Sequence, residues 1–193
     1  MQPPSQPQSQ SVQQINLAYD NQQDRLLLKA AVNNEQEIRV WITFRVARQI
    51  FIVLNREAHL PVAANSATAA LLDMQSPAEA TRQFEQEAEA VQNLDALDFD
   101  TAYQQRDSSV SEEELLAIET RFVSINDQLN SMQLVCAGGM NVNMGLNKEL
   151  VLAISRMLMI ASKDAGWVLP AEKEPEGVSS IVMQVPSEKQ VLH

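Results

Sequence analysis

The chain has 193 residues, of which 45% are hydrophobic and 20% are charged, and its formal net charge is −11. This is enough apolar material for a packed core, so a wholly disordered chain is excluded. No apolar run is long enough to cross a bilayer, and the first ten residues lack the basic and apolar regions of a signal peptide.

The acidic excess is confined to the middle third of the chain. Residues 61–120 contain 13 acidic and two basic side chains, whereas residues 1–60 and 121–193 are each close to neutral. A segment of this kind repels nucleic-acid phosphates and anionic lipid. The sequence therefore disfavours nucleic acid and predicts no membrane partner.

Cysteine and histidine are scarce, which restricts compartment and metal chemistry. Cys136 is the single cysteine, so an intrachain disulfide is impossible, and we expect a cytoplasmic protein. A structural zinc site normally takes four cysteine or histidine ligands, and only His59 and His193 accompany Cys136. Phosphate-binding and dinucleotide-binding glycine motifs are absent as well. The sequence predicts no metal and no cofactor.

The first predicted unit covers residues 12–60, after a tail at residues 1–11 that is rich in Gln, Pro and Ser and is expected to be disordered. Apolar alternation predicts strands at residues 15–19, 26–32 and 38–42, separated by polar turns. Thr43 is placed to cap a helix, and Pro61 ends it. The buried stripe of that helix follows helical spacing at Ala47, Ile50, Phe51, Leu54 and Ala58.

Residues 61–114 form an acidic insert. Its alanine-rich part, residues 66–74, can be helical. Ser76, Pro77 and Glu79 have the spacing of a capping box, which predicts a helix that runs to about Leu94. Phe84, Ala88 and Val91 give this helix a thin apolar stripe. Residues 95–111 are acidic and irregular.

Residues 115–169 resemble the first unit in pattern. An apolar stretch at residues 116–125 and alternation at residues 132–136 and 140–146 predict three strands, with Met140 and Met144 facing inward. Gly138 and Gly139 predict a hairpin turn. Asn147 is placed to cap a helix that Gly166 ends. Its buried stripe is Leu150, Val151, Ile154, Met157, Leu158 and Ala161.

These assignments predict an α+β fold with two strand-strand-strand-helix units joined by the acidic insert. Because residue identity between the units is poor, an internal repeat rests on pattern alone, and coincidence stays open. Residues 170–193 form a charged linker followed by a β-prone run at residues 178–185. We expect this run to pair with a sheet edge, because a single strand cannot satisfy its own backbone hydrogen bonds. Pairing within the chain is favoured, and exchange with a second copy would produce a homodimer.

Several groups of side chains have residue types that can carry chemistry. The aspartates at positions 95, 98 and 100 lack the spacing and glycine of a calcium loop. Met132, Met140, Met144, Met157 and Met159 fit a core better than a copper(I) site. Cys136 and His59 have no local support as a nucleophile–base pair. The sequence therefore predicts no catalytic residues and favours a non-enzymatic function.

Arg39, Trp41, Arg45, Arg48 and Arg56 form a basic cluster with one aromatic, which is the candidate partner interface. Arg and Trp are enriched in protein interfaces, although they also stack on single-stranded nucleic acid. A purely structural role, including docking on the acidic insert, stays open. The leading hypothesis is a protein-interaction module such as an adaptor, assembly factor or regulatory subunit. A small-molecule-binding domain with a methionine-lined pocket is the alternative, and an uncharacterised enzyme is third.

Overall fold

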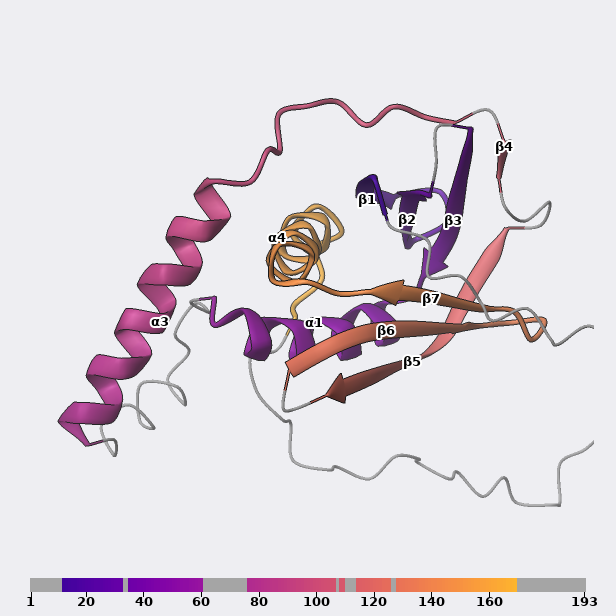
Figure 1. Ribbon diagram of the computed structural model, residues 1–193. Helices are drawn as coiled ribbons and strands as arrows, with labels where there is room; N and C mark the ends of the chain where they lie inside the picture. The colour runs from indigo at the N-terminus through magenta and orange to yellow at the C-terminus, as the bar shows by residue number, and fades with distance from the viewer. Residues whose placement is uncertain are drawn as a thin grey trace, which may run out of the picture.

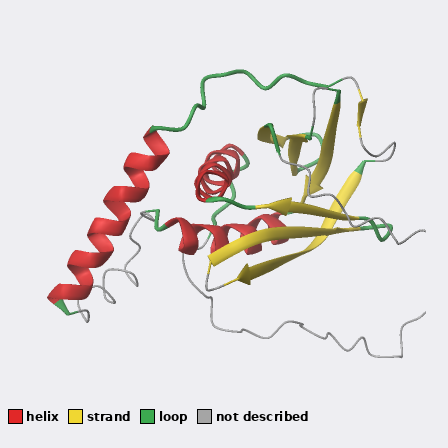
Figure 2. Ribbon diagram, viewed as in Figure 1, coloured by secondary structure: helices red, strands yellow, loops and turns green. Residues whose placement is uncertain are grey.

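The computed structural model describes residues 12–32, 35–60, 76–106, 108–109, 114–125 and 128–169. These residues form an α+β fold, as the sequence predicted, in which a mixed sheet is combined with three described helices (Figures 1 and 2). The predicted tail at residues 1–11, the alanine-rich segment at 66–74 and the β-prone run at 178–185 lie outside the described residues.

The first three strands form an antiparallel meander. They are β1 (Gln14–Asp20), β2 (Arg25–Ala31) and β3 (Gln36–Ile42), and all three strand predictions are confirmed. Helix α1 (Phe44–Ala58) follows directly, with the Thr43 hydroxyl accepting a hydrogen bond from the backbone N–H of Val46 at 3.5 Å. Every residue of the predicted α1 stripe is buried.

The last three strands form a second antiparallel meander, made of β5 (Leu115–Ile125), β6 (Gln128–Cys136) and β7 (Asn141–Gly145). Gly138 and Gly139 both have φ of 88°, in the region that a tight hairpin turn requires and that glycine adopts without strain. The predicted turn is therefore confirmed.

Helix α4 (Lys148–Asp164) follows β7, and the Asn147 side chain accepts from the Leu150 N–H at 2.8 Å, as its capping prediction required. Gly166, with φ of 68°, lies just beyond the helix end.

The two meanders join through a parallel pair in the middle of the sheet. Strand order is β1-β2-β3-β5-β6-β7, and the register of the central pair places Val40 opposite Leu115 and Ile42 opposite Ala117. The short strand β4 (Ser108–Ser109) also pairs with β3 in the parallel direction. As a result, β1 and β7 are the two outer strands of this sheet.

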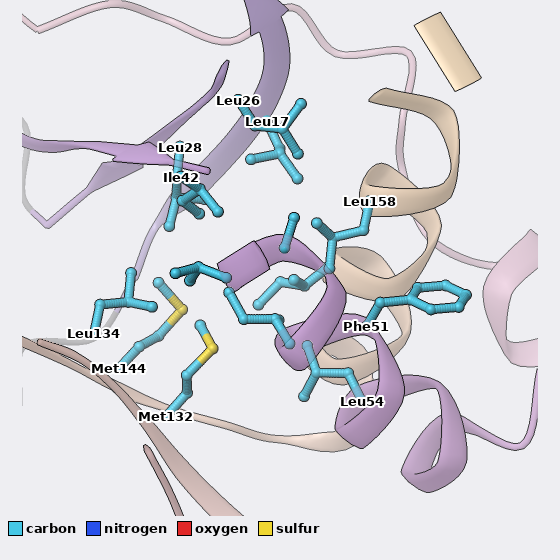
Figure 3. Packing of buried hydrophobic residues seen from close by; sticks show 14 of the residues in the cluster. Leu17, Leu26, Leu28, Ile42, Phe51, Leu54, Met132, Leu134, Met144 and Leu158 are labelled. Carbon is cyan, nitrogen blue, oxygen red and sulfur yellow. The ribbon is translucent and has the colours of Figure 1, made fainter. Parts of the chain in front are cut away.

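Helices α1 and α4 cover one face of the sheet, and the core lies between the two helices and this face (Figure 3). Leu26 and Leu28 of β2, Leu54 of α1 and Leu158 of α4 all belong to this core, and each is at most 3% exposed. Met132 and Met144 belong to the same core, with exposures of 1% and 3%.

Met140 departs from the sequence prediction. It precedes β7 at the hairpin turn and is 45% exposed, so its place in the inward register was wrong. The strand alternation that places Val142 and Met144 in the core does not extend back to this residue, because the turn ends the pleat.

Helix α3 (Pro77–Asp95) begins at the predicted capping box, in which Ser76 and Glu79 exchange hydrogen bonds. In Figure 1 it stands to one side of the sheet, and its one buried residue is Ala90. Phe84 and Val91 of the predicted apolar stripe are 72% and 38% exposed. Residues 96–106 then lead from α3 across the end of the sheet to β4 (Figure 1).

None of the described helices combines the length and the apolar composition that crossing a bilayer requires.

Candidate interaction site

Two members of the predicted partner interface, Arg39 and Trp41, lie on the sheet face that points away from α1. They alternate along β3 with Val40 and Ile42, which are core residues. Arg39 Nε lies 2.5 Å from Glu37 Oε1, and Trp41 is only 8% exposed. The indole N–H of Trp41 donates to Glu114 Oε2 at 2.7 Å. These contacts favour a structural role for both residues.

The other three predicted interface residues lie on α1, on the opposite side of the sheet. Arg45 is exposed, and its Nη2 donates to the backbone carbonyl of Ile118 in β5 at 2.8 Å. Arg48 is half-buried. Arg56 is exposed in the last turn of the helix, where a positive charge interacts favourably with the helix dipole. The structure therefore does not bring the five residues together as one surface.

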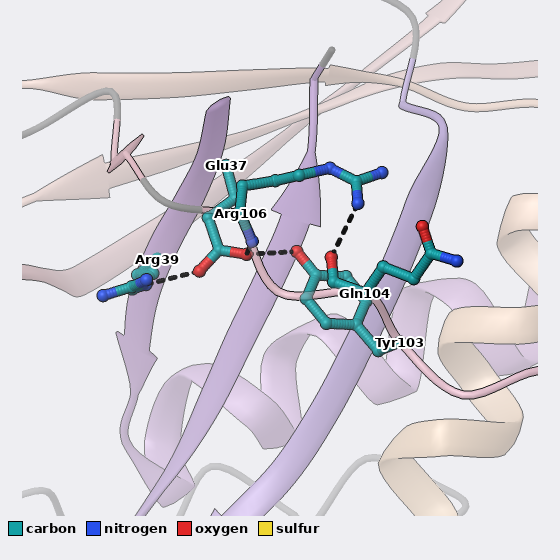
Figure 4. Close-up of polar contacts among 5 residues, drawn as sticks. All are labelled: Glu37, Arg39, Tyr103, Gln104 and Arg106. Carbon is teal, nitrogen blue, oxygen red and sulfur yellow. Dashed lines mark hydrogen bonds and ion pairs between the residues drawn. The ribbon is translucent and has the colours of Figure 1, made fainter. Parts of the chain in front are cut away.

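A buried carboxylate organises the residues that follow α3 (Figure 4). The Glu37 side chain is fully buried and accepts hydrogen bonds from Tyr103 Oη at 2.8 Å and from the Arg106 backbone N–H at 3.1 Å, in addition to its contact with Arg39. Burial raises the pKa of Glu37, but these donors outweigh it and hold the pKa below its usual value. Burial and the neighbouring carboxylate raise the pKa of Tyr103.

The Glu37 cluster holds residues 103–106 against the end of the sheet. The Gln104 backbone N–H also donates to Gln14 Oε1 at 3.2 Å, which ties the same segment to the start of β1. Because Tyr103 and Arg106 are both attached to Glu37, the path of the chain between α3 and β4 is fixed beside β1.

The segment so placed forms one wall of a cleft of about 640 Å³ beside β1. We call this cleft the β1 groove. The other walls are the first half of β1 with the two residues before it, and one side of α4. Its lining is Val12, Gln13, Gln14, Ile15, Asn16, Leu17, Leu97, Asp98, Phe99, Thr101, Tyr103, Asn147, Glu149, Leu150, Ala153, Met157 and Ile160.

The β1 groove has a mixed lining, which includes a group of apolar side chains and two exposed acidic ones. Phe99 and Ile160 are each 46% exposed, and Leu150 and Met157 lie on the same side of α4 at helical spacing from Ile160. Asp98 and Glu149 supply negative charge beside them. Hydrogen bonds to Asp98 from the Thr101 hydroxyl and from backbone N–H groups lower the pKa of this carboxyl.

A smaller cleft of about 410 Å³ lies where α1 ends and α4 begins, and its lining includes His59. Lys148 Nζ and Glu89 Oε1 form an ion pair there at 2.6 Å, which lowers the pKa of Glu89. Both side chains are mostly exposed, so this pair contributes little to stability. The cleft therefore has a mixed polar and apolar lining that contains one ion pair.

The remaining candidates for chemistry lie in structural positions. Cys136 is buried in the core, and burial raises the pKa of its thiol. His59 has φ of 51° and forms the C-terminal cap of α1. Among the described residues, no group of three or more His, Cys, Asp or Glu side chains is arranged to hold a metal ion.

The β1 groove was not identified from the sequence, because its walls come from three segments far apart in the chain. One signal was present: Phe99 interrupts an acidic stretch, and Ile160 lies outside the predicted buried stripe of α4. Each is an apolar side chain without a predicted partner. Only the fold shows that they share one cleft.

No protein-family model, no curated protein and no solved structure gives a significant match to this chain.

Proposed function

We propose that this chain is a non-enzymatic protein-interaction module that binds an extended apolar segment of another protein at the β1 groove. The observation that carries the proposal is the position of the groove along an outer strand of the sheet. Six consecutive residues, Val12 to Leu17, line it, so backbone as well as side chains borders the space.

The backbone of β1 supplies the first part of this recognition. Among the described strands β1 pairs only with β2, and it ends the strand order. An outer strand directs alternate N–H and C=O groups away from its sheet, and an extended peptide can pair with them as an additional strand. Pairing of this kind gives affinity without demanding a particular sequence.

Side chains beside the strand supply selectivity. A bound strand points alternate side chains to one face, and on the α4 side these would meet Leu150, Met157 and Ile160. Asp98 and Glu149 of the groove favour a partner with Lys or Arg beside its apolar residues. The net charge of −11 acts in the same direction over a longer range.

Small-molecule binding is the second candidate, favoured by one observation. A volume of about 640 Å³ is within the usual size of ligand clefts, which is roughly 300–1,000 Å³. Met157 lines the groove, whereas Met132 and Met144 are in the core, so the lining is not methionine-rich. This composition supports a peptide more than the predicted methionine-lined pocket.

Three finer expectations belong to the same proposal. A cytoplasmic location is supported by the single cysteine, Cys136, which is a buried free thiol. An internal repeat is supported by the two meanders, each followed by a capped helix in the same order. The description of residues 61–114 as an acidic insert is supported by the chain order: α3 lies between the two meanders in the sequence, whereas β3 and β5 pair directly in the sheet.

Peptide selection on the purified full chain tests the function. Peptides selected from a random library should alternate apolar residues, and their affinity is measured by fluorescence anisotropy. Ile160→Asp should weaken binding at least about tenfold, because it places a charge in the groove. The control is Ile118→Asp, since Ile118 lies on β5 away from the groove and is 44% exposed, close to the 46% of Ile160. Equal effects of the two variants would refute the proposal.

A further inference from the structure

We propose that the chain carries its own occupant for the β1 groove: the segment Val178–Val185, which adds to β1 as an antiparallel strand. This inference rests on the proposed function, because it makes the segment an internal competitor of the external peptide. An extended protein partner then binds by displacing a strand of the same chain, so the groove is self-regulated.

The first argument is where the described chain leads. Helix α4 begins beside the start of β1 and passes along it, and Trp167 then packs on Tyr19 near the other end of β1. The ring centroids of this pair are 5.9 Å apart, and Trp167 also contacts Phe44 at 5.2 Å. Leu169 packs against the core. The chain is therefore fixed at the Tyr19 end of β1, up to the last residue described.

The second argument is length and direction. Residues 170–177 join Leu169 to the segment and can extend over at most about 26–29 Å. The segment can thus start beside Tyr19 and run back toward Gln14, which makes it antiparallel to β1. The other outer strand, β7, lies five strand spacings away, about 24 Å across the sheet. Reaching it would use nearly all of the connection, whereas β1 is adjacent and gains a high effective concentration.

The third argument is the pattern of the segment. Ile181, Met183 and Val185 alternate, so in a strand they share one face. Facing α4, they would meet Met157 and Ile160. The segment has no charged residue, so it brings no negative charge close to Asp98 and Glu149 of the groove. Pro186 follows at once and limits the strand, since proline cannot donate to a ladder.

Hydrogen exchange of the full chain, followed by mass spectrometry, tests the inference. Peptides that cover residues 14–20 and 178–185 should both be protected. The double variant Ile181→Asp/Met183→Asp should increase exchange in both by at least about tenfold, and so should Ile160→Asp. The control double variant, Ser180→Asp/Gln184→Asp, carries the same charge on the other face of the strand and should leave both protected.

Light scattering identifies the molecule that supplies the strand. A monomer with both regions protected supports pairing within one chain. A dimer that Ile181→Asp/Met183→Asp converts to a monomer would overturn the inference in favour of a second copy. Exchange of residues 178–185 at the rate of an unfolded peptide would overturn it outright, and so would protection there without any change at β1.

The affinity for selected peptides separates this inference from the proposed function. If the segment competes, Ile181→Asp/Met183→Asp should bind such a peptide at least about tenfold more tightly than the natural chain. If binding is unchanged and still depends on Ile160, the proposed function stands and the competing segment is refuted. If the segment protects β1 but no peptide binds even when it is released, the proposed function fails and the strand assignment stands.

Discussion

Strands β1 to β3 and strands β5 to β7 lie side by side in one sheet. On the face that points away from α1 and α4, however, the two groups differ in how far their side chains are covered. On β3 the outward residues Glu37 and Trp41 are nearly inaccessible. Their hydrogen-bonding partners from beyond the first meander are Tyr103, Arg106 and Glu114. On β5 the side chains of Ile118, Val123 and Ile125 are 44–58% exposed. Similar local patterns thus produce one anchored surface and one open surface, and the difference comes from a segment that belongs to neither meander.

The outer strands differ in the same way. Strand β7 has five residues, and its outward positions carry Asn141, Asn143 and Gly145. Short, polar outer strands resist pairing with other chains. Strand β1 has seven residues and lies beside the β1 groove. The two outer strands therefore differ in length, in the polarity of their outward residues and in having a groove beside them.

Core substitutions should have the largest effect and test whether the two meanders are one unit. Leu28→Ala in β2 and Met132→Ala in β6 should each lower the free energy of unfolding by about 2–5 kcal/mol, because both side chains are at most 3% exposed. Thermal unfolding followed by circular dichroism should show one transition in both variants. Two separate transitions would mean that the meanders fold independently.

The anchored surface should depend on Glu37. Replacing Glu37 with Gln leaves at least one of its donors without a carboxylate partner. The free energy of unfolding at pH 7 should therefore fall by about 1–3 kcal/mol. The control is Glu119→Gln, because Glu119 pairs with Arg121 at a half-exposed position and should change stability by less than about 0.5 kcal/mol. Urea unfolding of both variants measures the difference, and equal values would contradict the role assigned to Glu37.

Acid should remove the effect of Glu37 in a defined direction. Its folded-state pKa lies below the usual value of 4.5, so the carboxylate stabilises the fold above that pH. The stabilisation is lost as the pH falls through the lowered pKa, where the folded protein takes up the proton. The stability difference between the natural chain and Glu37→Gln should therefore be constant near neutrality and shrink below about pH 4.5. A difference that persists unchanged in acid would show that packing, not charge, is responsible.

Helix caps should show a smaller contrast between the two units. The Asn147 cap of α4 has a 2.8 Å hydrogen bond, whereas the Thr43 cap of α1 has one of 3.5 Å. We expect Asn147→Ala to cost about 1 kcal/mol and Thr43→Ala about half of that. Urea unfolding tests which variant loses more stability, provided that the free energy of unfolding falls with urea concentration at the same slope in both. A larger loss at Thr43 would mean that the geometry of the hydrogen bond does not set the contribution of the cap.

Much of this architecture could be predicted because its signals are local. Alternation in β1 to β3, the capping residues Thr43, Ser76 and Asn147, and the paired glycines at 138 and 139 each depend on neighbours within a few positions. The predicted stripe of α1 is buried in full for the same reason. Patterns of this range are decided by backbone geometry and by which side of an element faces the core.

The candidate site could not be predicted, because its contacts join distant parts of the chain. Trp41 was expected at a partner interface, but Glu114, 73 positions away, accepts its indole hydrogen bond. Glu37 gave no signal, since Tyr103 follows it by 66 positions. The exposed stripe of α3 shows the reverse difficulty: an apolar pattern indicates a helix face without saying whether anything covers it.

The parallel pairing of β3 with β5 has a consequence for the order in which the molecule folds. Hairpins within each meander close short loops, whereas Val40 and Leu115 can meet only after the whole segment between them has been brought back. Contacts between such distant residues slow folding. We therefore expect the two meanders to form early and the pairing of β3 with β5 to form last. During synthesis, β3 emerges well before β5. The first meander can therefore form while the edge of β3 that will pair with β5 is still unpaired.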